Sequence, residues 1–499
     1  MVNDSFMRLQ EEVIRLIFGL KVKQLRTDKG ISLTDLATAT GISVSYLNEI
    51  EKGKKHPKPS KIAVIADVLG VTYDYLVSLQ LSKRLQPVGE LLHSNILSEL
   101  PLEHFGLDMS RVLDLFATAP AKLSAFVNTL LEISRAFDLR VEQFYFSALR
   151  SYQELHDNYF DEIELEVERF LEQQSINPDL TPDTGQLKQV LEDQFNIKIA
   201  PISLSDHPEL KPLRSIFVPG SSPQLLLNPN LTEQQRAFAL AREIGFQYLQ
   251  LQERPYTSTW VRVGSFEEVL NNFKASYFAG ALLLNRDRLV QDLERFFAMP
   301  KWDPEALLRL MEKYNTSPET FLHRITSLLP KFFSIKQLFF LRFYHEPAQE
   351  QYILTKELHL AGLHNPHASF LNEHYCRRWI SLTLFDKMEH AKPTGRPLVG
   401  IQRSAYINSS NEYLVLALAQ PAERTCNTIS IGLLINEHLQ QKIKFLNDPA
   451  IVTREVNETC ERCPAADCLE RAAAPTIFEK QLWQESVNQI LGELANPTE

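Results

Sequence analysis

Two short helix patterns joined through a glycine constrain the fold of this chain more than any other feature. Ser32 precedes the apolar pattern of residues 33–40, Gly41 follows it, and Ser43 precedes a second pattern over residues 44–51. Serine favours the N-cap because its hydroxyl accepts a hydrogen bond from the first turn, and glycine adopts the left-handed backbone of a tight turn. Two helices of about eight residues joined in this way form a helix-turn-helix, whose second helix enters the major groove of DNA.

The flanking segments complete a small helical domain. Further helices are expected over residues 6–30, which end on a glycine C-cap, and over residues 61–70 and 72–79. The five-helix pattern resembles the Cro and phage-repressor type of DNA-binding domain; a helical bundle of another kind is the alternative. The resemblance places four side chains at base edges and four lysines at phosphates, with Arg26 as a further phosphate contact: Ser43, Val44, Ser45 and Asn48, then Lys52, Lys54, Lys55 and Lys58.

The charge distribution favours a DNA-binding head on an acidic body. Residues 1–61 carry 11 Lys and Arg against 7 Asp and Glu, whereas the whole chain has a net charge of −10. No leader pattern and no apolar run near the ~18 residues of a membrane helix is found, so we expect a cytoplasmic protein that does not bind membranes.

A length of 499 residues predicts several domains, in a fold that is mainly α with an α+β body. The expected domains are a helix-turn-helix head, a helical linker, a zincin-like degenerate protease domain and an α+β sensor domain, over residues 1–85, 86–175, 176–330 and 331–499. The linker pattern predicts long helices, for example over residues 122–139 and 141–174. Their apolar stripes either pack against a second copy, as a homodimer or higher homo-oligomer on operator DNA, or cover the chain's own core.

A degenerate metal motif lies in the third domain, in the stretch "AFALAREIGFQYL", Ala237 to Leu249. Zinc proteases carry H-E-x-x-H on a helix because residues four apart share one face. Here Arg242 and Phe246 stand at the histidine positions, while Glu243 keeps the position of the general base. A helix over residues 186–195 and strands over residues 196–204, 214–220 and 223–229 are expected before this stretch, and a helix over residues 269–284 after it.

This order of elements resembles the protease domain of antirepressor-cleaving and radiation-response metalloproteases. In that family the third metal ligand is a glutamate on the second helix, and Lys274 occupies its position here. Guanidinium and ammonium groups cannot ligate zinc, so no catalytic residues are assigned. Two interpretations remain open: an internal salt-bridge network of Arg242, Lys274 and Glu243, or a pocket that holds a phosphate or carboxylate with Arg214, Arg242, Lys274 and Tyr277.

The C-terminal part combines strand patterns with clustered cysteines. Paired strands are expected over residues 331–347 and 351–362, and a hairpin over residues 412–435. In "CERCPAADCLERAAAP", Cys460, Cys463 and Cys468 lie within nine residues of a chain with five cysteines. This density indicates a zinc or iron–sulfur site in a reducing compartment, with Cys376 or Cys426 as the fourth ligand.

The combination of these parts with "CRRW" at residues 376–379 resembles the short-chain fatty acyl transcriptional regulators. The resemblance implies a ligand-responsive regulator that binds short-chain acyl-coenzyme A and holds a [4Fe–4S] cluster, with zinc as the alternative; its ligands are Cys376, Cys460, Cys463 and Cys468. Two other classes are considered. One is a repressor or antitoxin whose body carries a structural zinc site and binds only a protein partner, and the other is a metalloprotease that cleaves a repressor through an unrecognised site.

Overall fold

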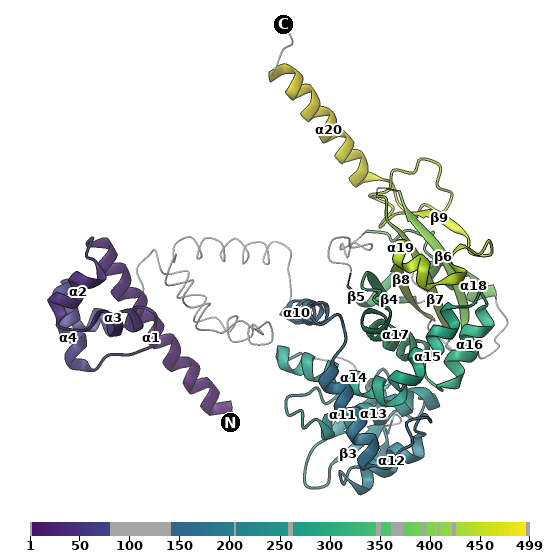
Figure 1. Ribbon diagram of the computed structural model, residues 1–499, viewed down its shortest axis with the longest axis horizontal. Helices are drawn as coiled ribbons and strands as arrows, with labels where there is room; N and C mark the ends of the chain where they lie inside the picture. Colours follow the sequence, from purple (N-terminus) through teal and green to yellow (C-terminus); the bar gives the residue numbers. More distant parts are fainter. Residues whose placement is uncertain are drawn as a thin grey trace. The chain divides into compact units, whose positions relative to one another are not determined.

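The computed structural model describes residues 2–79, 141–203, 206–257, 263–345, 351–360, 373–390, 396–407, 409–421 and 426–495 (Figure 1). The chain divides into two compact units, Met1–Tyr152 with Val263–Glu267, and Gln153–Arg262 with Glu268–Glu499. The expected multidomain fold is confirmed: a helical head is followed by a body of helices and two sheets. None of the described helices is long and apolar enough to cross a membrane.

The head contains the five predicted helices. They are α1 (Val2–Asp28), α2 (Leu33–Thr40), α3 (Val44–Glu51), α4 (Pro59–Leu69) and α5 (Tyr73–Val77). Ser32 and Asp35 form a capping box on α2, Gly41 has a φ of +67°, and the Ser43 hydroxyl accepts the N–H of Tyr46 to cap α3. Leucine and isoleucine side chains of α2, α3 and α4 form the core: Leu36, Leu47, Ile50, Ile62, Ile65 and Leu69. The local signals that predict the helix-turn-helix are therefore the ones that build it.

The single helix predicted over residues 141–174 is wrong. The structure has two helices, α10 (Val141–Leu155) and α11 (Asp161–Gln173), separated by Asp157 and Asn158 with φ angles of 50° and 52°. The Asn158 side chain is buried and donates to the hydroxyls of Thr326 and Ser327 at 3.1 and 3.3 Å. These tertiary hydrogen bonds stabilise the left-handed turn. The helix expected over residues 122–139 lies outside the described residues.

The protease-like part contains the predicted helix and three strands. They are α12 (Thr184–Asp193), β1 (Lys198–Pro201), β2 (Ser215–Val218) and β3 (Gln224–Leu227), with a 3-10 turn η2 (Pro208–Leu210) between β1 and β2. The sheet order is β1-β3-β2, parallel between β1 and β3 and antiparallel between β3 and β2. Five helices follow: α13 (Glu233–Tyr248), α14 (Phe266–Leu283), α15 (Arg286–Phe297), α16 (Pro304–Lys313) and α17 (Pro318–Phe333).

The C-terminal part is a six-stranded sheet with the order β5-β4-β8-β7-β6-β9. Its strands are β4 (Leu338–His345), β5 (Tyr352–His359), β6 (Leu398–Tyr406), β7 (Glu412–Pro421), β8 (Cys426–Leu434) and β9 (Thr453–Val456). Its helices are α18 (Ile380–His390), α19 (Glu437–Lys442), η3 (Lys444–Asn447) and α20 (Thr476–Ala495). The predicted pair β4–β5 and hairpin β7–β8 are both antiparallel, as expected.

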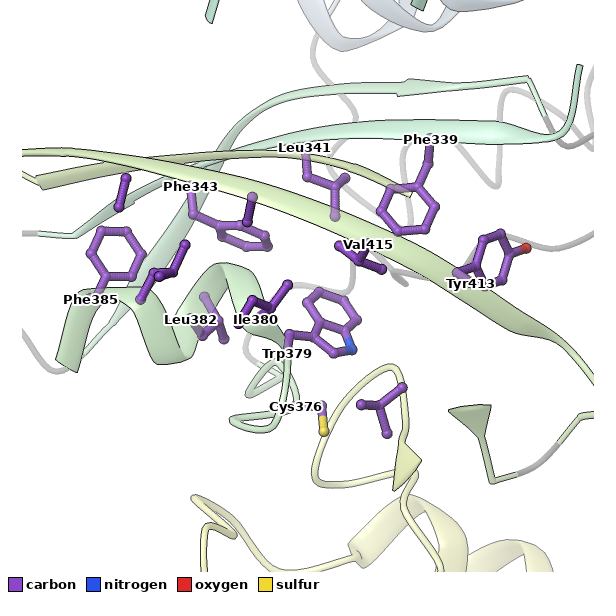
Figure 2. Packing of buried hydrophobic residues seen from close by; sticks show 14 of the residues in the cluster. Phe339, Leu341, Phe343, Cys376, Trp379, Ile380, Leu382, Phe385, Tyr413 and Val415 are labelled. Carbon is purple, nitrogen blue, oxygen red and sulfur yellow. The ribbon is translucent and has the colours of Figure 1, made fainter. Parts of the chain in front are cut away.

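The two faces of this sheet carry different elements. Alternate residues of β4, including Phe339 and Phe343, pack on the face covered by α18, where Trp379 and Cys376 lie at the edge of the core (Figure 2). On the other face, Phe340 contacts His323 of α17 with ring centroids 5.4 Å apart. Because successive side chains of a strand point to opposite faces, Arg342 belongs to the α17 side. The cysteine segment and the α17 contact are thus separated by the sheet.

Candidate functional site

The head exposes the four side chains predicted to contact bases and the four lysines predicted to contact phosphates. These are Ser43, Val44, Ser45, Asn48, Lys52, Lys54, Lys55 and Lys58. Val44 and Asn48 are four residues apart and therefore share one face of α3, whereas Leu47 and Ile50 are buried in the core. The lysines follow α3 directly. This exposure is what a recognition helix followed by phosphate contacts requires, and the individual contacts stay predictions.

Arg26 does not join this surface, contrary to expectation. Its Nε and Nη2 donate to the carboxylate of Glu51 at 2.6 and 3.0 Å, and its Nη1 donates to the carbonyl of Ile31 at 2.9 Å. Glu51 is 4% exposed. The pair therefore fixes the end of α3 against α1 and so positions the second helix of the helix-turn-helix.

Replacing Asn48 by alanine is expected to weaken binding to the preferred operator by about 1–3 kcal/mol, because an amide can form two hydrogen bonds to adenine. Binding to random DNA and its salt dependence should not change, since phosphate contacts remain. Fluorescence anisotropy with operator and random duplexes measures both. Thr27→Ala, at an exposed position at the end of α1, is the control. An equal loss on both duplexes would show that Asn48 does not read bases.

Helices α13 and α14 pack closely at the position of the degenerate motif. A Cβ on Gly245 would lie 3.0 Å from the carbonyl oxygen of Ala275 and 3.2 Å from its Cα. The glycine therefore permits close contact between the two backbones. The helix that carries Arg242, Glu243 and Phe246 and the helix that carries Lys274 are neighbours, as in the metalloprotease arrangement that the sequence resembles.

Glu243 pairs with a residue that the sequence did not single out. Arg254 donates to both carboxylate oxygens of Glu243, at 2.7 and 2.6 Å, and both side chains are buried. The guanidinium carbon of Arg254 lies 3.8 Å from the ring centroid of Phe246 and 4.3 Å from that of Phe217. The predicted partnership of Glu243 with Arg242 and Lys274 is therefore wrong, because a guanidinium held between two aromatic rings neutralises the carboxylate.

Arg242 and Lys274 have other environments. Arg242 is buried and donates to Asn272 Oδ1 at 3.2 Å and to Ser215 Oγ at 3.3 Å. Burial lowers the pKa of Arg242 to about 10; Glu243 opposes this shift, while Arg254 and Arg214 add to it. Lys274 is half-buried and forms no hydrogen bond or ion pair within the part of the chain that the structure describes. The positive charges close to Arg242 are those of Arg254 and Arg214.

Tyr277 lies at a different contact. Its hydroxyl donates to Glu164 of α11 at 2.7 Å and accepts the N–H of Phe160 at 3.3 Å. Arg324 donates to the same carboxylate at 2.5 and 2.9 Å. Burial raises the pKa of Tyr277 well above its usual value. Tyr277 therefore holds α14 against α11 and does not face the predicted anion pocket. Three of the four residues predicted for that pocket remain candidates: Arg214, Arg242 and Lys274.

Replacing Arg254 by alanine is expected to destabilise the body by about 3–5 kcal/mol, because the buried carboxylate of Glu243 loses its counter-charge. Urea unfolding followed by circular dichroism measures the loss. Arg309→Ala is the matched control, since Arg309 forms a 3.1 Å pair with Asp303 and its side chain is 62% exposed; its loss should be near 0.5 kcal/mol or less. Equal effects of the two substitutions would mean that the Glu243–Arg254 pair is not the element that stabilises this site.

Cys376 and Cys460 are brought together by a short backbone pairing. Tyr375 and Thr459 form an antiparallel bridge, the N–H of Cys376 donates to the carbonyl of Glu458 at 3.2 Å, and the N–H of Cys460 donates to that of His374 at 2.8 Å. Two segments far apart in the sequence therefore present a cysteine each at one place.

The loop that follows Cys460 is held by one arginine. Arg471 donates to the carbonyls of Cys460 at 2.8 Å, of Cys463 at 3.2 Å and of Ala465. The N–H of Ala472 donates to the Cys460 sulfur at 3.4 Å. Arg471 thus closes the loop, and one backbone N–H donates to the Cys460 sulfur, which favours the thiolate form.

The donor set fits a metal centre with sulfur ligands. Cys376, Cys460 and Cys463 are buried, Cys468 is half-buried, and none of the four is in a disulfide. Burial raises the pKa of Cys376 to about 11; the backbone N–H groups of Asn457 and Arg378 oppose this shift, and the proximity of Cys460 and Cys463 adds to it. Among the described residues, no three His, Cys, Asp or Glu side chains already surround one point as metal ligands.

Two buried donors near Cys376 also fit such a centre. The side-chain nitrogens of Trp379 and Asn457 have no hydrogen-bond partner in the described part of the chain. Figure 2 shows the indole nitrogen on the side of the ring that faces Cys376. Inorganic sulfide or ligand sulfur would supply the acceptor that these donors lack. Cys426 begins β8, paired in register with Pro421 and His345, and its prediction as an ordinary buried thiol stays a prediction.

Two family models match separate parts of the chain. Residues 22–76 match the model of the helix-turn-helix family, and residues 192–326 match that of the IrrE N-terminal-like domain. The head is 42% identical over 60 residues to "Uncharacterized HTH-type transcriptional regulator YazB" of Bacillus subtilis, which is 12% of this chain and 87% of that protein. It is 34% identical over 61 residues to "HTH-type transcriptional repressor RghR" of the same organism, of which it spans 45%. A solved structure, "Mycobacterium tuberculosis transcriptional regulator", is similar with a TM-score of 0.45 and 17% identity over 66% of this chain and 93% of that one.

The exposed recognition helix and the matches to its fold define a DNA-binding protein. The chain belongs to the helix-turn-helix family of transcriptional regulators, and operator DNA is its partner.

Proposed function

We propose that this chain is a ligand-responsive regulator of short-chain acyl-coenzyme A metabolism, of the acetate and propionate type. It acts in the cytoplasm as a homodimer or higher homo-oligomer, and Cys376, Cys460, Cys463 and Cys468 hold a [4Fe–4S] cluster. The observation that carries the proposal is the meeting of buried free cysteines from two distant segments in a protein with a recognition helix. Short-chain acyl-coenzyme A is proposed as the effector because the chain resembles the short-chain fatty acyl regulators over nearly its whole length.

The protein's own groups prepare the cysteine site. The backbone bridge between Tyr375 and Thr459 sets the position of Cys376 beside Cys460, and Arg471 holds the loop with Cys463 by its carbonyls. Thiolates held close together repel each other, so a cationic centre would stabilise them. When bound, an iron–sulfur cluster supplies this charge compensation and a redox-active group.

The effector site is proposed around Arg242 in the protease-like part. Arg214, Arg242 and Lys274 supply positive charge for the phosphates or thioester of an acyl-coenzyme A, and the ring of Phe246 lies beside Arg242 with its centroid 5.9 Å from the guanidinium carbon. Arg242, Phe246 and Lys274 stand where the related metalloproteases have metal ligands, so we propose that this part binds a metabolite and does not cleave peptides. In a dimer each chain carries one helix-turn-helix head. A ligand that binds one conformation of the body more tightly than another would shift the equilibrium between them, and with it the spacing of the two heads on DNA.

Calorimetry with a short-chain acyl-coenzyme A tests the effector site. An Arg242→Ala, Lys274→Ala double variant should bind about tenfold or more weakly than the unmodified chain, because each charge-assisted contact contributes to affinity. Arg309→Ala, far from these residues in sequence and exposed, should bind normally. Normal affinity of the double variant would place the effector elsewhere or remove it.

A further inference from the structure

Three basic side chains from three segments of the body surround one carboxylate. Glu319, in the first turn of α17, lies 3.5 Å from Lys356 of β5, 3.5 Å from Arg342 of β4 and 4.0 Å from Arg214, which directly precedes β2. The distances join carboxylate oxygens to side-chain nitrogens. The four residues are called the Glu319 cluster below. They connect the part that matches the IrrE-like domain with the C-terminal sheet.

The positive charges exceed the charge of the carboxylate they share. Arg342 and Lys356 are direct cross-strand partners on β4 and β5, where like charges repel. Arg342 also donates to the neutral side chain of Asn427 at 3.2 Å. His323 adds no charge, because burial and Lys356 lower its pKa to about 3. Arg342 and Lys356 alone outnumber this carboxylate by one, and Arg214 adds a third cation at 4.0 Å. The cluster also lies beside the positively polarised N-terminus of a helix of 16 residues.

The geometry of the Glu319 cluster leaves room for a stronger acceptor. Its nitrogen–oxygen distances of 3.5–4.0 Å exceed the roughly 2.7–2.9 Å of a charge-assisted hydrogen bond. The side chains are also reachable from solvent, because Arg214 is 41% exposed, Lys356 43%, and Arg342 and Glu319 each 23%. Although burial raises it, the three cations hold the pKa of Glu319 at about 2, so the carboxylate is ionised at neutral pH.

We propose that the Glu319 cluster is a binding site for a small anion that carries a phosphate group. The negative charge of a phosphate compensates the excess of positive charge, and its tetrahedral oxygens accept from guanidinium and ammonium groups. A ligand held there ties the α17 segment to the edge strand β5 and its neighbour β4. The site shares only Arg214 with the proposed effector pocket, and it depends neither on acyl-coenzyme A nor on the cysteine site.

The phosphate comes either from a free anion or from a coenzyme, and calorimetry of the full chain separates the two. Inorganic phosphate and pyrophosphate are titrated first, alone, and then into protein saturated with a short-chain acyl-coenzyme A. If protein saturated with acyl-coenzyme A no longer binds phosphate or pyrophosphate, the coenzyme's phosphates occupy the Glu319 cluster. If it still binds them unchanged, the occupant is a free anion. Both results support the Glu319 cluster.

Two substitutions with opposite expected effects test the assignment. Lys356→Ala should weaken binding of pyrophosphate about tenfold or more, and Lys356→Arg should largely preserve it. Glu319→Gln should strengthen binding, because the competing internal anion is lost while the cations remain. Lys331→Ala is the matched control on α17, since this lysine is 45% exposed and pairs with Asp161 at 2.9 Å.

The assignment is overturned if neither anion gives a binding signal, or if Lys356→Ala and Glu319→Gln both bind as the unmodified chain does. Far-UV circular dichroism checks that each variant is folded. Lys356 is the more exposed of the two residues, so its variant tests the site even if Glu319→Gln does not fold. A negative result for the Glu319 cluster does not change the titration of the Arg242→Ala, Lys274→Ala variant with acyl-coenzyme A. The two proposals are therefore tested separately.

Discussion

A Cys463→Ser variant purified without oxygen is expected to lose most of the iron that the unmodified chain retains, which should be about four atoms per chain for a [4Fe–4S] cluster. Cys463 is buried, and its backbone N–H donates to the carbonyl of Cys460 at 3.3 Å, so serine would leave a hard hydroxyl where a soft thiolate is required. Iron and sulfide assays with a visible absorption spectrum measure the loss.

The control for this experiment is Cys426→Ser, which changes the cysteine that is not assigned to the cluster. It should retain the iron and the spectrum. Iron retained in Cys463→Ser, or lost equally in both variants, would contradict the assigned ligand set. Zinc in place of iron and sulfide in the unmodified chain would support the four cysteines as ligands and reject the cluster.

Replacing Lys52, Lys54, Lys55 and Lys58 together by alanine is expected to reduce binding to any duplex by several orders of magnitude at low salt. Each lysine that neutralises a phosphate releases counterions, so the slope of log affinity against log salt should fall by about 3–4. The four side chains are exposed directly after α3, and none of them belongs to the hydrophobic core of the head. Fluorescence anisotropy between low and physiological salt measures the slope.

A quadruple variant of the body provides the matched control. Lys188, Lys301, Lys331 and Lys336 are equally exposed, and their replacement removes the same charge from the protein as a whole. The salt slope of this variant should equal that of the unmodified chain. An unchanged slope in the head variant, or an equal decrease in both, would mean that net charge and not the α3 surface governs DNA binding.

The sequence predicts the elements whose signals are local. Ser32, Gly41 and Ser43 mark the helix-turn-helix because caps and turns depend on neighbouring residues. The strand pair β4–β5 and the hairpin β7–β8 are predictable because each joins segments that are adjacent in the chain. The strands β6 and β9 pair in parallel across a long connection, and no local pattern indicates such a contact.

The features that the sequence misses depend on tertiary contacts. The turn at Asp157 and Asn158 interrupts a continuous amphipathic pattern, and its cause is a hydrogen bond to α17. Arg254 lies in an irregular segment after α13, so nothing in its surroundings indicates that it binds Glu243. Arg26 has the charge of a phosphate contact, and its partner Glu51 becomes visible only when α1 and α3 are packed.

The candidate sites also differ in how much of each the sequence predicts. Residue spacing alone indicates the cysteine site at Cys460, Cys463 and Cys468, but it leaves Cys376 and Cys426 as equal choices for a fourth ligand. The bridge between Tyr375 and Thr459 supports Cys376, because it places this residue beside Cys460. The Glu319 cluster could not be predicted, since its members come from α17, two strands and a loop.

The measurement that tests most directly whether this regulator responds to a metabolite is an operator titration of the anaerobically purified protein. Affinity for an operator fragment selected from random DNA is measured by anisotropy with and without a short-chain acyl-coenzyme A, after calorimetry has shown that the ligand is bound. We expect the affinity to change by about fivefold or more, the lower end of typical coupling between two sites. Superimposable titration curves with bound ligand would contradict the proposed function.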